Sequence, residues 1–144
     1  MANKFNLKVI TQTRVAYEGE TEVVVLPGLM GELAIMSDHM PLIVSLAPGL
    51  MTIKNEGEDR VASVFGGFAE VVDNRVTVAA SDFHWPDEVD KARAQRALET
   101  AERTASEATS DLEVKRAQLA MRRANVRLEL SAYVADKGRS VSGS

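Results

Sequence analysis

The chain of 144 residues contains no cysteine and only two histidines, His39 and His84. The lack of cysteine excludes disulfide bonds, thiolate-bound zinc, iron–sulfur clusters and a thiol nucleophile. Two histidines also argue against a His-based metal site. No stretch approaches the ~18 consecutive apolar residues of a membrane-spanning helix. A net charge of −4 argues against a dedicated nucleic-acid binder.

The N-terminal sequence MANKFNLKVI has neither the apolar segment of a signal peptide nor the Arg/Ser bias of a transit peptide. We therefore expect a soluble, intracellular protein. At roughly 150 residues per domain, the length fits one domain, or one small domain with an appendage.

Proline, glycine and alanine divide the chain into two unlike parts. All four prolines lie at or before Pro86, and no glycine occurs between Phe68 and Lys137. Eleven alanines lie between Ala92 and Ala135. Glycine and proline interrupt regular structure, whereas alanine is the best helix former. This distribution predicts a turn-rich strand domain over residues 1–86, helices over residues 87–138 and a frayed tail over residues 139–144.

The first part has the pattern of short strands separated by turns. Phe5, Leu7 and Val9 alternate with polar residues, as one buried face of a sheet requires. Further runs of β-branched and apolar residues occupy positions 22–26, 40–46, 49–53, 67–72 and 75–78. Turn residues stand between them at positions 27–28, 48–49, 56–59 and 73–74. Strands at this spacing predict an antiparallel sandwich or barrel.

The second part has the pattern of a helical hairpin. Pro86-Asp87 offers Asp87 as an N-cap, and small residues recur at spacings of three and four from Ala94 to Ala108. Ser110 to Glu113 forms a capping-box sequence that marks the start of a second helix. We therefore place the turn between the helices near residues 104–109. A stripe repeating every seven residues predicts the packing face of the second helix and consists of Leu112, Leu119, Val126 and Tyr133, joined by Leu130.

Composition leaves the role of this hairpin open. Alanine buries little apolar area, so the hairpin is either closely packed and stable or weakly held and detachable. Residues 114–128 contain no acid and five basic residues: Lys115, Arg116, Arg122, Arg123 and Arg127. They form either a solvated basic face or a surface for an anionic ligand or an acidic partner. Asp90 is likewise either a first-turn acid or a ligand-binding group.

No constellation of catalytic residues is visible. The sequence has no Ser/His/Asp motif, and Gly28 to Gly31 lacks the Lys-Ser/Thr of a phosphate-binding loop. We interpret His39 as a loop residue, and His84-Trp85 as a hydrophobic anchor for the hairpin at the junction of the two parts. A free-standing β-sandwich ligand-binding module with a helical appendage is the alternative class. The few aromatic residues, mostly in apolar strand contexts, give that alternative little support.

Six segments, in this order, resemble the epsilon subunit of the F-type ATP synthase. They are residues 27–35, 39–42, 46–49, 66–71, 76–78 and 89–94. The resemblance covers nearly the whole chain, and these segments carry it. Two positions depart from the usual pattern, with Ala34 where glycine is common and Val44 where threonine is common. The resemblance implies an N-terminal β-sandwich followed by a two-helix hairpin.

The resemblance also implies a function without catalysis. Such a subunit belongs to the central stalk, or rotor, and couples proton translocation to ATP synthesis. Its sandwich would contact the gamma subunit through Thr11 and His39 and the polar loops of the c-ring through Glu32. No cofactor would be required, and membrane association would be indirect, on the cytoplasmic face of the bacterial inner membrane.

The helical hairpin in this family can extend along gamma and inhibit ATP hydrolysis. The resemblance thus implies that the five basic residues of the second helix face acidic segments of the alpha and beta catalytic subunits. In some members the folded hairpin binds regulatory ATP. The positions that match that site are Val89, Asp90, Arg93 and Ala94, with Arg123 and Arg127 on the second helix.

Overall fold

The chain forms two compact units, Met1–His84 and Trp85–Ser144. The computed structural model describes the backbone of residues 3–142 and the side chains of residues 3–133. The division lies between His84 and Trp85, whereas the sequence placed it after Pro86.

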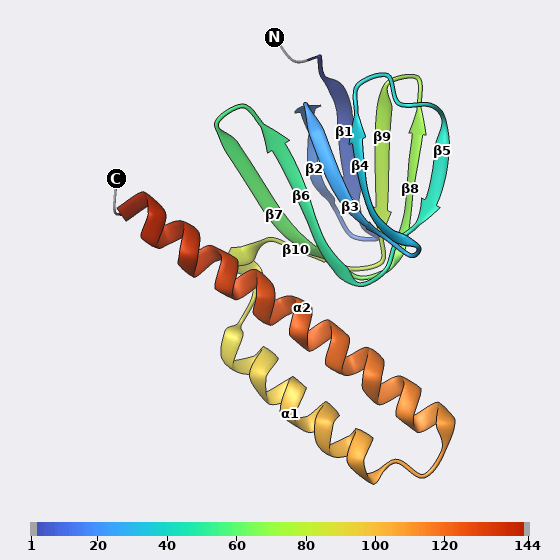
Figure 1. Cartoon of the computed structure of the whole chain (residues 1–144), viewed down its shortest axis with the longest axis vertical. Helices are drawn as coiled ribbons and strands as arrows, with labels where there is room; N and C mark the ends of the chain where they lie inside the picture. The colour runs from blue at the N-terminus through green and yellow to red at the C-terminus, as the bar shows by residue number, and fades with distance from the viewer. Residues whose placement is uncertain (1–2, 143–144) are drawn as a thin grey trace. The chain divides into compact units, whose positions relative to one another are not determined.

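The first unit is a β-sandwich of two five-stranded sheets, which confirms the predicted fold class (Figure 1). One sheet has the strand order β2-β1-β9-β8-β5 and the other has the order β10-β7-β6-β3-β4. The strands are β1 (Phe5–Ile10), β2 (Val15–Thr21), β3 (Val23–Gly28), β4 (Gly31–Met36), β5 (Leu42–Ser45), β6 (Gly49–Asn55), β7 (Glu58–Val64), β8 (Gly67–Val72), β9 (Arg75–Ala80) and β10 (Phe83–His84).

Alternate side chains of both sheets fill the core between them. Leu7 and Val9 of β1 are buried, as their alternation predicted, and so are Leu26 of β3 and Met51 and Ile53 of β6. Successive side chains of a strand point to opposite faces, so every second residue enters the core. The result is one continuous apolar interior for the first unit.

One strand pair departs from the antiparallel arrangement. β1 lies between β2 and β9, and it pairs parallel with β9, with Leu7 opposite Val76 and Val9 opposite Val78. Neighbours joined by a short turn must be antiparallel. The chain between β1 and β9 contains the strands β2 to β8, so no hairpin turn fixes the relative direction of β1 and β9.

The sequence pattern missed β2, β4 and β7 as separate strands, and also the two-residue strand β10. β2 and β4 lie at sheet edges, where alternation between buried and exposed positions is weak. β7 begins with three charged residues, and the first two of them, Glu58 and Asp59, fall in the turn predicted at residues 56–59. Its buried half, from Val61 to Val64, is too short to stand out.

The two-residue turn between β8 and β9 fixes a neighbouring loop. Asp73 and Asn74 both adopt left-handed backbone angles, with φ of 50° and 59°, as a tight hairpin turn requires. The Asn74 side-chain oxygen accepts from the Asp38 amide at 2.8 Å and from the Ser37 hydroxyl at 3.3 Å. Its amide group donates to the Lys4 carbonyl at 3.0 Å. Asn74 thereby holds the loop that leads to the predicted interface residue His39.

The second unit begins with a short 3-10 helix, η1 (Pro86–Glu88), followed by α1 (Lys91–Glu107). The sequence predicted Asp87 as the N-cap of the first helix, but Asp87 lies inside η1. Asp90 takes that role, and its carboxylate accepts from the Arg93 amide at 3.1 Å. Pro86 explains the difference, because its fixed φ favours the first position of a helical turn.

The helix α2 (Asp111–Ser142) runs antiparallel to α1 (Figure 1). The connection is residues 108–110, later than predicted, because α1 continues to Glu107. The Ser110 hydroxyl accepts from the Glu113 amide at 3.2 Å, but the Glu113 carboxylate accepts from the Thr109 amide at 2.9 Å. Only half of the predicted capping box is therefore formed.

α2 continues past Gly138 to Ser142, so it includes most of the tail that we expected to be frayed. Residues 143–144 lie outside the described residues. Within the described part of the chain, neither helix has an apolar stretch long enough to cross a bilayer.

Alanines form the buried side of α1, whereas α2 buries two alanines together with Val126 and Leu130. Ala94 and Ala101 are the buried residues of α1, and Ala117 and Ala124 are buried on α2. The predicted seven-residue stripe is wrong in its first half, since Leu112 and Leu119 are 57% and 45% exposed, and it is confirmed at Val126 and Leu130, which are fully buried. Small side chains let two helix backbones approach closely, which fits the alanines at the buried positions of α1.

Candidate functional site

The outer face of one sheet carries an apolar patch at its edge. Phe68 and Val72 of β8 lie two strand positions on either side of Glu70, and Ile43 of β5 is paired with Glu70. Side chains two residues apart on a strand lie on the same face of the sheet. Phe68 and Val72 are therefore the diagonal neighbours of Ile43 on the adjacent strand. We name Ile43, Phe68 and Val72 the β5–β8 patch; Ile43 is 71% exposed. Exposed apolar clusters on a folded domain mark interaction surfaces.

The loops that carry Thr11 and His39 are locally ordered. The Thr11 hydroxyl accepts from the Arg14 amide at 3.2 Å and from the Thr13 amide at 3.3 Å, so it shapes its own loop. His39 is half-buried, and its Nδ1 donates to the Met40 carbonyl at 2.8 Å. Met40 is exposed and leads into β5, which carries Ile43. His39 therefore adjoins the strand of the β5–β8 patch.

Glu32 lies beside a second exposed apolar feature, the tip between β3 and β4. Gly28 pairs with Gly31, and a Cβ at Gly28 would lie 2.6 Å from the Gly31 carbonyl oxygen. This close turn leaves Leu29 and Met30 65% and 96% exposed. Glu32 is also exposed, so the tip combines two apolar side chains with one carboxylate.

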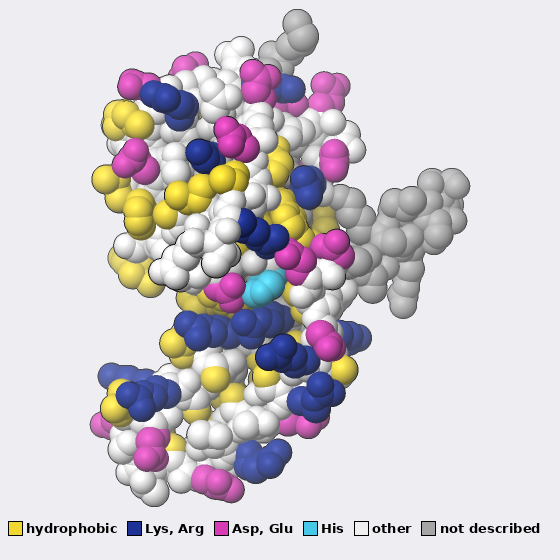
Figure 2. Space-filling view, turned by 180° about the vertical axis from the view of Figure 1, so that it is seen from behind, with side chains coloured by type: hydrophobic (Ala, Val, Ile, Leu, Met, Phe, Trp, Pro, Cys, Tyr) yellow, Lys and Arg dark blue, Asp and Glu magenta, His cyan; other side chains and the backbone are white. Residues whose placement is uncertain are grey.

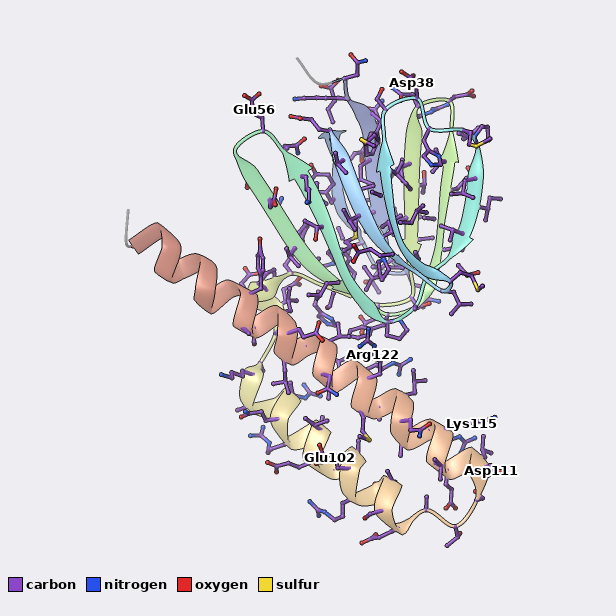
Figure 3. All side chains as sticks on the ribbon, viewed as in Figure 1. Asp38, Glu56, Glu102, Asp111, Lys115 and Arg122 are labelled. Carbon is purple, nitrogen blue, oxygen red and sulfur yellow. The ribbon has the colours of Figure 1, made fainter. Side chains whose placement is uncertain are left out.

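The five basic residues of α2 form two stripes rather than one face. Lys115 and Arg122 are seven residues apart and share one side of the helix (Figure 3). Arg116, Arg123 and Arg127 share another side, about 100° away. All are exposed except Arg127, which is half-buried. In Figure 2, Lys and Arg side chains gather on the visible face of the helical unit.

The residues predicted to bind a nucleotide are only partly brought together. Val89 is the C-cap of η1, the Asp90 carboxylate caps α1, and Ala94 is buried in the hairpin. Arg93 lines a groove between α1 and α2 that has a volume of about 550 Å³. Arg123 and Arg127 do not line this groove.

The groove contains residues that the sequence reading missed. Its walls hold Arg96, Thr100 and Thr104 of α1 and Glu113 of α2, and Arg116 is the one predicted basic-face residue in it. The positions of Arg93, Arg96, Thr100 and Thr104 follow helical spacing along one side of α1. The sequence shows this spacing, but only the pairing of α1 with α2 shows that these residues border a groove.

Comparison with known families accounts for both units. A family model described as the ATP synthase, Delta/Epsilon chain, beta-sandwich domain matches residues 4–86. A second, the ATP synthase, Delta/Epsilon chain, long alpha-helix domain, matches residues 87–132. The chain belongs to the ATP synthase delta/epsilon chain family. The resemblance found in the sequence is thereby confirmed.

Curated relatives in the delta/epsilon family match along most of their length. An ATP synthase epsilon chain of Caldanaerobacter subterraneus is 38% identical over 133 residues, which are 92% of this chain and 96% of the relative. One of Brevibacillus brevis is 42% identical over 112 residues, which are 77% of this chain and 85% of the relative. A matching chain in the Euglena gracilis mitochondrial ATP synthase has a TM-score of 0.78 at 20% identity, covering 90% of this chain and 81% of that chain. This structural likeness shows the same fold.

Proposed function

We propose that this chain is the non-catalytic epsilon chain of a proton-translocating ATP synthase, a rotor subunit of its central stalk. The observation that carries the proposal is the match of both family domains, in order, over residues 4–132. Relatives named ATP synthase epsilon chain extend over nearly the same length. The relatives from Caldanaerobacter subterraneus and Brevibacillus brevis are bacterial, which supports a peripheral position on the cytoplasmic face of the inner membrane.

The exposed surfaces of the sandwich fit two different partners. The β5–β8 patch, with His39 on the loop that leads into β5, offers an apolar area for the gamma subunit. Thr11 lies on the ordered loop between β1 and β2, at the other edge of the same sheet, and offers a further contact. The β3–β4 tip offers Leu29, Met30 and Glu32 to the polar loops of a c-ring. Two separate surfaces of this kind suit a subunit that is held between a stalk and a ring.

The first test measures binding to the gamma subunit. The full chain and gamma should co-elute at micromolar concentration, and Ile43→Lys should weaken the complex about tenfold or more. Burial of an isoleucine contributes ~1.5–3 kcal/mol, and 1.4 kcal/mol corresponds to a factor of ten. The matched control is Met36→Lys, because Met36 is also exposed but lies on β4 outside the patch. Absence of co-elution would overturn the rotor assignment, and equal weakening by both variants would exclude the patch.

The helical hairpin is the candidate regulatory part. The buried residues of α1 are alanines, which bury little apolar area each, and this favours a hairpin that can open. Its two basic stripes would meet acidic segments of the alpha and beta subunits when it extends. Inhibition of ATP hydrolysis follows from this arrangement, since an extended helix would obstruct the catalytic subunits.

A regulatory nucleotide forms the second part of the proposal. ATP would bind at the start of α1 through Asp90 and Arg93, with Arg123 and Arg127 of α2 on its phosphates. Arginine suits phosphate because its planar donors form paired hydrogen bonds. Such a ligand would join the two helices and hold the hairpin closed.

Calorimetry and Trp85 fluorescence test this nucleotide site. ATP should bind at millimolar concentration or below, and Asp90→Asn should weaken it several-fold while α1 stays intact. Asparagine remains a good N-cap, so this variant removes the charge without removing the cap. Arg103→Gln serves as the control, because Arg103 is exposed on α1 away from the predicted site. A flat titration to millimolar ATP would remove the nucleotide from this account.

A further inference from the structure

Left-handed backbone angles are concentrated where the β4–β5 loop, residues 37–41, meets the turn between β8 and β9. Asp38 has a φ of 62°, and Asp73 and Asn74 have φ of 50° and 59°. These are the non-glycine residues with such angles in the part of the chain that the structure describes. The conformation is costly for a residue with a side chain and persists where neighbouring groups hold it. A two-residue hairpin turn explains Asp73 and Asn74, but Asp38 needs another cause.

The side chain of Asn74 supplies the group that holds Asp38, which Figure 3 shows at one end of the sandwich. Its Oδ1 accepts from the Asp38 amide at 2.8 Å and from the Ser37 hydroxyl at 3.3 Å. Its Nδ2 donates to the Lys4 carbonyl at 3.0 Å. The orientation of the amide follows from these partners, because a backbone N–H can only donate and a carbonyl can only accept. The oxygen of Asn74 therefore binds the loop, and the nitrogen binds the residue that precedes β1.

The loop held in this way carries part of the proposed contact with gamma. His39 follows Asp38 directly, and the loop leads into β5, which carries Ile43. The bond from His39 Nδ1 to the Met40 carbonyl stays within the loop. Among the described residues, Asn74 supplies the side-chain hydrogen bonds that join the loop to another segment of the sandwich. A segment that is ordered before it binds loses less conformational entropy when it docks.

We infer that Asn74 is a positioning residue for the gamma interface, because its side-chain oxygen fixes the β4–β5 loop in the conformation that docks. The inference rests on the proposed function, since gamma is the partner. Asn74 is half-buried and acts through the loop, so its own side chain does not have to touch gamma. The arrangement raises affinity by lowering the ordering cost of binding, without enlarging the contact area.

Asn74→Gly tests this role. Glycine adopts left-handed angles without steric cost, so the variant removes the side-chain bonds and keeps the turn. It should bind gamma roughly five- to tenfold more weakly than the wild type, as measured by calorimetry. In the isolated chain, the Asp38 amide should exchange its hydrogen about tenfold faster by NMR, because it loses its acceptor.

The matched control is Asp73→Gly, which makes the same change one position earlier in the turn. Asp73 also has a positive φ, and its side chain is exposed. Within the described residues its carboxylate has no hydrogen-bond partner. The control should therefore leave both the gamma affinity and the exchange of the Asp38 amide unchanged.

Asn74→Asp separates positioning from a general effect on stability. Aspartate keeps an oxygen that accepts from the Asp38 amide and the Ser37 hydroxyl, but it cannot donate to the Lys4 carbonyl. Both variants of Asn74 lose the link to Lys4, so both should lower the urea midpoint of the sandwich. Only Asn74→Gly releases the loop. Asn74→Asp should therefore keep the protection of the Asp38 amide and hold the gamma affinity to within about twofold of the wild type.

Three results would overturn the inference while the wild type still binds gamma. They are unchanged affinity in Asn74→Gly, an equal loss in Asp73→Gly, and an equal loss in Asn74→Asp. The last would show that the link to Lys4, through stability, accounts for the effect. Failure of the wild type to bind gamma would instead overturn the rotor assignment itself, so the two failures are distinct.

Discussion

A complex that contains a chain shortened by deletion of residues 89–144 should assemble normally and hydrolyse ATP faster than the wild type. The deletion removes both helices but leaves every strand of the sandwich, including the β5–β8 patch and the β3–β4 tip. The surfaces proposed to bind gamma and the c-ring are therefore kept. If the hairpin holds about nine in ten complexes inactive, its removal raises the rate about tenfold. The measurement is steady-state ATP hydrolysis by the purified complex.

A second variant tests whether inhibition of ATP hydrolysis depends on the positive charge of α2 as well as on the presence of the helices. The double substitution Lys115→Gln and Arg122→Gln removes one basic stripe, and both residues are exposed on α2 (Figure 3). It should raise hydrolysis by part of the full effect if that stripe meets acidic segments of the catalytic subunits. Unchanged hydrolysis after the deletion would show that the hairpin is not inhibitory. Loss of assembly would show that the sandwich alone does not dock.

The substitution Leu26→Ala should cost the sandwich about 2–5 kcal/mol of unfolding free energy. Leu26 lies on β3 between the two sheets and is 0% exposed, so truncation leaves a cavity that the surrounding strands only partly fill. Leu29→Ala is the matched control, because it makes the same chemical change three residues later at a side chain that is 65% exposed. We expect an effect within about 0.5 kcal/mol there.

Urea unfolding of the full chain, followed by circular dichroism of the strands, measures both effects. The midpoint for Leu26→Ala should fall markedly with little change in the slope, because the surface exposed on unfolding stays similar. Equal losses in the two variants would contradict the division between core and tip. Such a result would mean that the Leu29 side chain also packs against the sandwich.

The interior of the sandwich could be predicted from the sequence more reliably than its margins. Leu7 and Val9 alternate with polar residues because β1 is flanked on both sides and has one face in the core. β2 ends its sheet, and its polar sequence VAYEGET carries almost no alternation. The pairing of β1 with β9 was not predictable, because period-two patterns define faces but not the neighbour along the sheet.

In the hairpin, the sequence identified the helices but not which sides of them meet. The leucines at positions 112 and 119 follow a seven-residue spacing as regular as that of the alanines, and leucine is the stronger apolar signal. The structure instead buries alanines of both helices and leaves these two leucines exposed, and it uses Asp90 rather than Asp87 as the cap. Both differences depend on tertiary fit, which local propensity does not contain.

The candidate sites show the same limit. Arg93 and Arg116 were each identified from their position along a helix, but 22 sequence positions separate them and their shared cavity arises only when the helices pair. The apolar patch of Ile43, Phe68 and Val72 likewise requires the register of β5 on β8. Residue type and spacing predict a helix or strand face, whereas a site needs two such faces together.

The parallel pairing of β1 with β9 has a consequence for the order in which the protein is made. β1 is synthesised before the other strands of the sandwich, yet it pairs with β9 (Arg75–Ala80), which is synthesised almost last among them. Until β9 is made, β1 has only β2 beside it in its sheet. The sandwich is therefore completed late and cooperatively, when β9 pairs with the strand that is synthesised before the others. During synthesis, the N-terminal strand is the segment that most needs protection from association with other chains.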